Sequence, residues 1–369
     1  MKKYEIVYED LCKEISARLQ KNVNALPTEA EMCRSLSVSR QTLRKALGRL
    51  REEHVVTGRQ GSGYVLTGIL PHRVNQIVIL AESDEAYMFP GMISELSRTF
   101  DSLHYQVAVI IIGTDTQRER SALLTLIKDP PRGLFAWAQH SALPSPNADL
   151  YHQLAALGTS IVFPAGRCPN IMVGRTPVTD QISGGEMLTE HLILDGHSTI
   201  GMILLEDDII GHERYLGYCR AMIRHGLPIS DRLIFKVPAR RMDRIRHDHA
   251  NRDLSQIAEE LSQSATAVVC QTDELAFSLI RVLENRKIRV PDMISVAGFD
   301  NSYLRTAGRI SLTTMQPYPQ TVIQQAASVM RNMLMPGSAI SEKNGWKLIR
   351  GGSTSFVFGT PLASDRSFS

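Results

Sequence analysis

Residues 27–47 read Pro-Thr-Glu-Ala-Glu-Met-Cys-Arg-Ser-Leu-Ser-Val-Ser-Arg-Gln-Thr-Leu-Arg-Lys-Ala-Leu, a pattern that predicts two short helices joined by a tight polar turn. Thr28 and Glu31 have the spacing of a capping box, in which each side chain accepts a backbone hydrogen bond at the helix start. Ser39 is placed to cap the second helix, because its hydroxyl can accept from a free backbone N–H of the first turn. The second helix then has an apolar stripe at helical spacing, made of Leu43, Ala46, Leu47 and Leu50.

The exposed start of the second helix carries residue types that read DNA. The apolar stripe leaves Arg40, Gln41, Thr42 and Arg44 mostly facing outwards. Arginine and glutamine hydrogen-bond to guanine and adenine edges, and arginine also binds phosphate. A basic helix start that follows a tight turn is typical of the recognition helix of a helix-turn-helix. The alternative interpretation is that these side chains only solvate a surface helix.

A glycine-rich hairpin follows the helices. Residues 54–57 and 64–66 are short strand candidates on either side of the turn Gly-Arg-Gln-Gly-Ser-Gly at 58–63. Glycine permits positive φ and lets a backbone approach a ligand closely, so the pattern predicts a wing. We reject a nucleotide-binding loop, because no helix follows the Gly-x-Gly.

Taken together, residues 4–66 resemble the winged helix-turn-helix of the GntR family. The resemblance is carried by the segments 26–29, 38–40, 43–47 and 60–65. It implies a dimeric operator-binding protein in which the residues matching Arg40, Arg44, Gln60 and Gly61 touch DNA. Lys3, Gln41 and Thr42 complete the predicted DNA-binding set. Many relatives have an arginine where this chain has Ala30, which implies that one phosphate contact is missing here.

Positive charge is concentrated in this N-terminal part. Residues 1–68 contain twelve Lys/Arg and eight Asp/Glu, a net charge of +4, whereas the whole 369-residue chain has a net charge of +3. The positive charge therefore lies where DNA phosphates would be met. The length predicts two or three domains. We expect a DNA-binding domain at 1–68, a linker at 69–75 and a ligand-binding and dimerisation domain at 76–369.

The composition argues against membrane, secreted and metal-binding proteins. No stretch approaches the ~18 consecutive apolar residues of a membrane span. The charged start is followed by an amphipathic helix pattern rather than by a signal-peptide core. The five cysteines have no metal-binding spacing. We therefore expect a cytoplasmic protein with no metal, no cofactor and no membrane partner.

From residue 76 onwards, apolar strand candidates alternate with amphipathic helix candidates. The expected strands are 76–81, 106–112, 133–138, 160–163, 199–204, 233–237, 267–270 and 294–298, and the expected helices are 90–103, 116–128, 148–157, 180–194, 212–225, 252–262 and 273–285. This alternation predicts an α/β fold with parallel sheets buried on both faces. The strands fall into two groups, about 76–177 and 178–310, which indicates two lobes with a cleft between them. Ligands of such sheets bind beyond the carboxyl ends of the strands.

The second group of strands carries motifs at residues 192–203, 214–218, 266–276, 290–301 and 312–314. In order and spacing they resemble the effector domain of the LacI/GalR repressors, which are relatives of the periplasmic sugar-binding proteins. The resemblance covers roughly 76–357 and implies a two-lobed sugar site. Arg214 matches the family arginine that hydrogen-bonds to sugar hydroxyls, and Asp300 matches the aspartate that accepts from them. A planar donor fork and a two-oxygen acceptor suit vicinal diols.

Other candidate residues keep a structural alternative. Thr272 stands where many relatives have asparagine, and Asp273 fits the family motif but is also placed to cap a helix. In the loop at 82–89, Tyr87 or Phe89 is predicted to stack on a sugar, and Glu82 or Asp84 to accept its hydroxyls. The alternative is an acidic solvated loop with an anchoring aromatic residue. Trp137 is either a stacking platform or a core residue. We interpret the basic run at 240–247 as a solvated surface loop rather than a second DNA contact.

These observations predict a transcriptional regulator that releases its DNA operator when a small sugar closes the cleft. A homodimer would place two recognition helices one DNA turn, or a multiple of it, apart. The combination of domains resembles the L-arabinose-responsive repressors, so the expected effector is a monosaccharide, and first a pentose. The alternatives are an enzyme and a sugar-binding protein without a direct regulatory role. We find no nucleophile elbow, metal spacing or Schiff-base lysine context that indicates an enzyme.

Overall fold

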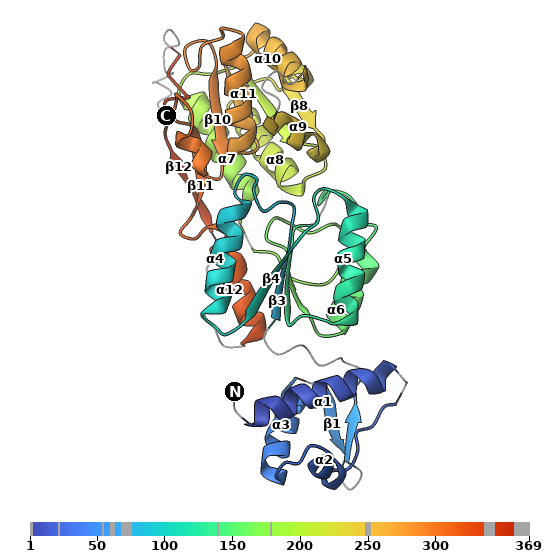
Figure 1. Ribbon diagram of the computed structural model, residues 1–369. Helices are drawn as coiled ribbons and strands as arrows, with labels where there is room; N and C mark the ends of the chain where they lie inside the picture. The colour runs from blue at the N-terminus through green and yellow to red at the C-terminus, as the bar shows by residue number, and fades with distance from the viewer. Residues whose placement is uncertain are drawn as a thin grey trace, which may run out of the picture.

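The computed structural model describes residues 3–20, 23–53, 55–59, 63–67, 76–138, 140–177, 179–247, 252–335 and 344–357. A small N-terminal domain precedes a larger part that consists of two lobes, one stacked on the other (Figure 1). Among the described residues, no helix is long and apolar enough to span a bilayer.

The N-terminal domain is a winged helix-turn-helix, as the sequence predicts. It contains α1 (Lys3–Gln20), α2 (Glu29–Ser35), α3 (Arg40–Glu52) and the antiparallel hairpin of β1 (Val56–Arg59) and β2 (Gly63–Leu66). The capping box of Thr28 and Glu31 is present, and the Ser39 hydroxyl accepts from the backbone N–H of Thr42. The stripe of α3 is buried against residues of α1 and α2, among them Leu11, Ile15 and Met32. The wing-tip residues Gln60 and Gly61 lie outside the described residues.

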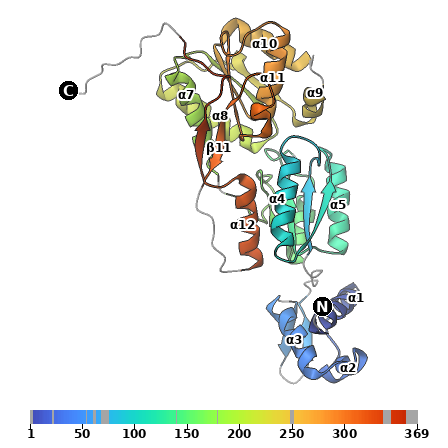
Figure 2. The ribbon, with the colours of Figure 1, turned by 60° about the vertical axis from the view of Figure 1, so that its left-hand side comes forward.

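Lobe 1 is a parallel sheet with helices on both faces. Its strand order is β4 (Gln106–Ile111), β3 (Gln76–Ala81), β5 (Gly133–Ala136) and β6 (Ser160–Val162). The helices α5 (Thr116–Lys128) and α6 (Ala148–Ala156) pack on one face. The other face is covered by α4 (Phe89–Asp101) and α12 (Val322–Leu334), which lie side by side in both views (Figures 1 and 2).

Lobe 2 has the strand order β12 (Gly345–Ile349), β11 (Thr313–Tyr318), β10 (Ser295–Phe299), β9 (Ala267–Cys270), β7 (Ile200–Leu205) and β8 (Ile234–Val237). All neighbours are parallel except β11 and β12. One face packs on α7 (Gln181–Leu194) and α8 (Ile209–Arg224). The other face packs on α9 (Met242–His247), α10 (Arg252–Ser264) and α11 (Asp273–Asn285). The predicted α/β class with two lobes of largely parallel sheet is confirmed.

The predicted grouping of strands is right, but one helix crosses between the groups. Helix α12 follows the strands of lobe 2 in sequence and yet packs on lobe 1, where Ile323, Ala326 and Met330 are buried. Strand β12 then returns the chain to lobe 2. Neither element was predicted, so the two lobes are joined by more chain crossings than the sequence pattern indicated.

The interpretation of residues 240–247 as a surface loop is wrong. A 3₁₀ turn at Ala239–Arg241 leads into the short helix α9. Met242 and Ile245 are three residues apart, so they lie on one face of this helix, and both are buried in the core of lobe 2. The basic run at 240–247 therefore contains a short amphipathic helix, whose Arg246 contacts Glu274 of α11.

Candidate functional site

A cavity of about 190 Å³ lies between the two lobes. Its walls come from segments that directly follow strands: Glu82 after β3, Trp137 after β5, Gln271 after β9 and Asp300 after β10. These are the carboxyl ends of parallel strands, where α/β sheets bind ligands. The cavity therefore lies where the sequence predicted a cleft.

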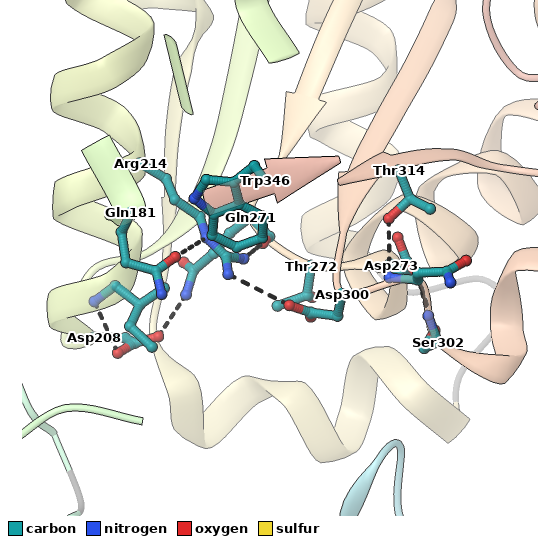
Figure 3. Close-up of polar contacts among 12 residues, drawn as sticks. Gln181, Asp208, Arg214, Gln271, Thr272, Asp273, Asp300, Ser302, Thr314 and Trp346 are labelled. Carbon is teal, nitrogen blue, oxygen red and sulfur yellow. Dashed lines mark hydrogen bonds and ion pairs between the residues drawn. The ribbon is translucent and has the colours of Figure 1, made fainter. Parts of the chain in front are cut away.

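Arg214 of α8 is held in one orientation inside this cavity (Figure 3). The side chain is buried, and its Nε donates to Gln181 Oε1 at 3.0 Å while Nη1 donates to the carbonyl oxygen of Gln271. The guanidinium carbon lies 4.1 Å from the centre of the Phe299 ring and 5.4 Å from that of Trp346. The remaining amino group, Nη2, lies 3.4 Å from Asp300 Oδ1. A guanidinium fixed on three sides is a preorganised donor.

Asp300 receives a second contact from the opposite lobe. The Tyr87 hydroxyl donates to Asp300 Oδ2 at 2.6 Å. Burial raises the pKa of Tyr87, and the Asp300 carboxylate raises it further, so the hydroxyl stays protonated and remains a donor. Tyr87, Asp300 and Asn301 all have left-handed φ, at 50°, 101° and 47°. Non-glycine residues in this region are strained, and such strain gathers at binding sites.

A second polar bridge between the lobes is built on Asp208, which caps α8. Its carboxylate accepts from the Ser141 hydroxyl of lobe 1 at 2.9 Å and from the backbone N–H of Ile210 at 3.2 Å. The side-chain amide of Gln271 donates to the same carboxylate. Nearby, His140 Nδ1 of lobe 1 lies 2.6 Å from Asp207 Oδ2 of lobe 2. Side chains thus join the two lobes at more than one place around the cavity.

Thr272 and Asp273 have different places. Thr272 lines the cavity, and its hydroxyl caps α11 by accepting from the backbone N–H of Leu275. Asp273 is fully buried behind the cavity wall, where Oδ2 accepts from the backbone and hydroxyl of Ser302 at 2.8 and 3.1 Å. Burial, followed by repulsion from Asp300, raises the pKa of Asp273 to about 7. The structure thus gives the capping role to Thr272, and Asp273 anchors the loop that carries Asp300.

The lobe 1 wall of the cavity is partly aromatic. Phe89 and Trp137 pack edge to face, with ring centres 5.7 Å apart, and both line the cavity. Trp137 therefore packs against a neighbour and also lines the cavity, and its stacking on a ligand stays a prediction. An aromatic face beside fixed polar groups is a common composition for a small-molecule site.

Sequence reasoning missed several residues of the site. Asp208 and Gln271 directly follow strand candidates, so their position at carboxyl ends was a usable signal. Gln181 begins the first helix after the chain enters lobe 2, and Trp346 lies in an unassigned strand, so neither had a local signal. Arg246 was set aside as part of a like-charge run, although it lines the cavity.

The predicted DNA-binding residues that the structure describes lie on one module. Arg40, Gln41 and Arg44 are exposed on the first turns of α3, and Lys3 is exposed at the start of α1. The Thr42 hydroxyl instead lies 2.9 Å from that of Ser39, within the cap of α3. Arg44 pairs with Glu29 of α2, with Nη2 3.1 Å from the carboxylate, and stays 65% exposed. Arg40, Gln41, Arg44 and Lys3 are therefore accessible at the surface, and Glu29 orients Arg44.

Two family descriptions match separate parts of the chain. Residues 3–66 match the bacterial regulatory proteins of the gntR family. Residues 189–354 match the periplasmic binding protein-like domain. The matched regions contain the helix-turn-helix and most of lobe 2 with α12.

The chain is also similar to named regulators and to solved structures. It is 30% identical to the arabinose metabolism transcriptional repressor of Geobacillus stearothermophilus over 90% of this chain and 91% of that protein. The protein of the same name from Halalkalibacterium halodurans is 26% identical over 85% and 84%.

Two solved structures have the same fold. The regulator CelR in complex with cellobiose has a TM-score of 0.62 at 17% identity, covering 91% of this chain and 94% of that one. The regulator CcpA of Lactococcus lactis has a TM-score of 0.64 at 18% identity, covering 77% of this chain and 100% of that one. This chain is therefore a ligand-responsive DNA-binding transcriptional regulator, and it belongs to the family of GntR-type regulators with a periplasmic-binding-protein-like domain that includes the arabinose metabolism repressors.

Proposed function

We propose that this regulator is a repressor, released from its operator when a monosaccharide binds between the lobes. The observation that carries the proposal is the group of Arg214, Asp300 and Tyr87, which brings a fixed donor, an acceptor and a residue of the opposite lobe to one cavity. A sugar needs donors and acceptors together, since each buried hydroxyl left unpaired weakens binding. Because related repressors are named for arabinose metabolism, the first candidate effector is L-arabinose.

Release requires that the sugar prefer the arrangement of lobes that binds DNA less well. The cavity walls come from both lobes, so a bound sugar would change how the lobes meet. Lobe 1 in turn touches the DNA-binding domain, where Arg132, just before β5, lies 3.2 Å from Glu53 at the end of α3. This contact supports a route from the cleft to the recognition helix.

A panel of monosaccharides in a thermal-shift assay tests the effector proposal. A sugar present at 100 times its Kd should stabilise the protein by about 2.7 kcal/mol. The operator is first obtained by selecting duplexes from a random pool with the intact protein. The proposal expects the stabilising sugar also to dissociate the selected duplex. A sugar that stabilises the protein and leaves the duplex bound would contradict release.

On DNA, we propose that Arg40, Gln41 and Arg44 contact the operator, together with Lys3, Thr42, Gln60 and Gly61. Replacing Arg44 by alanine is expected to weaken operator binding by roughly 1–3 kcal/mol, because one phosphate or guanine contact is lost. Melting temperature and sugar affinity should not change, since the side chain is exposed. Gel-shift titration of the selected duplex measures the effect.

Arg289→Ala is the matched control for Arg44→Ala. Arg289 is also exposed and also pairs with a single carboxylate, that of Asp292 at 3.1 Å, but it lies in lobe 2. Operator affinity should stay at the wild-type value in this variant. If both variants bind the operator like wild type, Arg44 is not part of the interface.

We further propose that the protein acts as a homodimer in the cytoplasm, where its operator is. Two copies related by a two-fold axis would present two recognition helices to two half-sites. Light scattering coupled to gel filtration should give twice the chain mass of 41.1 kDa. A single-chain mass at the concentrations that saturate the operator would contradict the dimer.

A further inference from the structure

The charged groups of the cavity leave no free cation for an anionic ligand. Both lining arginines already have carboxylate partners: Arg214 contacts Asp300, and Arg246 Nε lies 2.6 Å from Glu274 Oε1. Arg246 Nη1 also lies 2.7 Å from Asp243. Among the described residues that line the cavity, no lysine, and no arginine without a carboxylate partner, faces the ligand space.

Two of the helices that begin at the cavity, α8 and α11, have side-chain caps, whereas α4, which begins there with Met88 at its N-cap, has no side-chain cap. A helix N-terminus attracts anions through its free N–H groups and its dipole. Helix α8 begins at the cavity with Asp208 as its cap, and that carboxylate already accepts the N–H of Ile210. Helix α11 has Thr272 as its cap, with Asp273 and Glu274 in its first turn. At the starts of α8 and α11, carboxylates of the chain itself therefore disfavour the binding of a ligand phosphate or carboxylate.

Glu82 differs from the other acids of the cavity. It follows β3 at the carboxyl end of lobe 1, and within the described residues it has no hydrogen bond or ion pair, although it is partly buried. The charged groups around it are Arg246, Glu274, Asp243 and Asp208. Desolvation raises the pKa of Glu82 to about 7, although Arg246 acts in the opposite direction. Glu82 is thus an acceptor without a partner on the lobe opposite Arg214.

We propose that Glu82 determines the charge specificity of the site, accepting a hydroxyl of an uncharged sugar and excluding phosphorylated and carboxylated sugars. An uncharged sugar would lie between Arg214 and Asp300 on lobe 2 and Glu82 on lobe 1, so it would have hydrogen-bond partners on both sides. A phosphate or carboxylate would meet Glu82 and Asp208 without a compensating cation. The inference rests on the proposed effector role of the cavity.

Calorimetric titration of the intact protein tests this specificity. The ligands are L-arabinose, D-xylose, D-ribose and D-galactose, each with its terminal phosphate and its aldonic acid. We expect the free form of the effector sugar to bind and its two anionic forms to bind at least about 100-fold more weakly. In Glu82→Gln, the free sugar should bind about 10-fold more weakly, because a charged acceptor becomes neutral. The ratio between the affinities for the free sugar and for its anionic forms should also become smaller than in wild type.

The pH dependence separates a contact with the sugar from a structural role. As pH rises from 6 to 8, Glu82 loses its proton and becomes the better acceptor, so wild-type affinity for the free sugar should rise. This rise should be smaller in Glu82→Gln. Asp273 also has a pKa near 7, but it is present in both proteins, so the difference between the two profiles belongs to Glu82. Asp84→Asn is the matched control, because Asp84 is an exposed acid of the same loop, and it should behave like wild type.

The outcomes distinguish this inference from the effector proposal. An anionic form that binds as tightly as its free sugar would overturn the role of Glu82 and leave the effector role of the cavity standing. Identical affinities and pH profiles for wild type and Glu82→Gln would overturn it as well. If no sugar in either form binds, the effector proposal fails, and this inference fails with it.

Discussion

Replacing Arg214 by alanine is expected to abolish the response to the sugar while operator binding persists. Arg214 is 2% exposed, and its side chain provides hydrogen bonds to Gln181 and the Gln271 carbonyl, as well as the contact with Asp300. Its removal deletes a charged donor of the cavity and leaves a sugar hydroxyl unpaired, which costs about 1–3 kcal/mol of binding free energy. A loss of that size lowers sugar affinity by about 5- to 150-fold. Calorimetric titration with the effector sugar measures it.

The contact between Arg214 and Asp300 has a second interpretation, which is that the pair only holds lobe 2 together. In that case Arg214→Ala would melt at a lower temperature without ligand and would also lose operator binding. The control is Arg214→Lys, which keeps the charge but lacks the planar fork. It should fold and bind the operator, yet respond poorly to the sugar. Wild-type sugar affinity in Arg214→Ala would remove Arg214 from the site.

Gly217→Ala should destabilise the two-lobed domain by about 3 kcal/mol, the upper part of the usual range for overpacking. A Cβ at this position would lie 2.0 Å from the carbonyl oxygen of Ile182 and 2.6 Å from the backbone nitrogen of Glu186. These are backbone atoms of α7, so relief requires the two helices to move apart. Since Arg214 lies one turn earlier on α8, that movement should also weaken sugar binding.

The matched control for Gly217→Ala is Gly48→Ala. Gly48 lies inside helix α3, and a Cβ there would meet nothing within 4 Å. Alanine should therefore be neutral or stabilising by about 0.5–1 kcal/mol, the usual gain in a helix interior. Denaturant unfolding compares the two variants with wild type. A Gly217→Ala protein as stable as Gly48→Ala would show that α7 and α8 are not in close backbone contact.

The N-terminal domain was predictable because its signals are local. The cap residues Thr28 and Ser39 lie within three positions of the N–H groups that they accept from, and the stripe of α3 repeats at helical spacing. The strands of the lobes were also predictable, since buried parallel strands are short apolar runs between helices. Helix α8 begins at Ile209 rather than at 212, because Asp208 caps it.

The contacts that build the cavity depend on parts of the chain that are distant in sequence. Arg214 lies in the helix that follows β7, Asp300 directly follows β10, and both match family motifs, so the sequence indicated them. Their contacts with Gln181 and Tyr87 join positions 33 and 213 residues apart in the sequence, so no local pattern indicates these contacts. Trp346 packs on Phe299 from a strand that is antiparallel to its neighbour, a position that an alternating pattern of strands and helices does not predict. Arg246 was assigned to a surface loop, because the interpretation gave the run of like charges more weight than the helical spacing of Met242 and Ile245.

The most direct test of the account is a sugar titration of the preformed operator complex, followed by fluorescence anisotropy of the labelled duplex. Wild-type protein and Arg214→Ala are compared at concentrations that saturate the duplex, first with L-arabinose and then with any sugar that stabilises the wild type. The account predicts that the sugar releases the duplex from wild type and leaves the Arg214→Ala complex intact. Equal release from both proteins, or no release from wild type by a sugar that binds it, would contradict the claim that occupation of this cleft controls DNA binding.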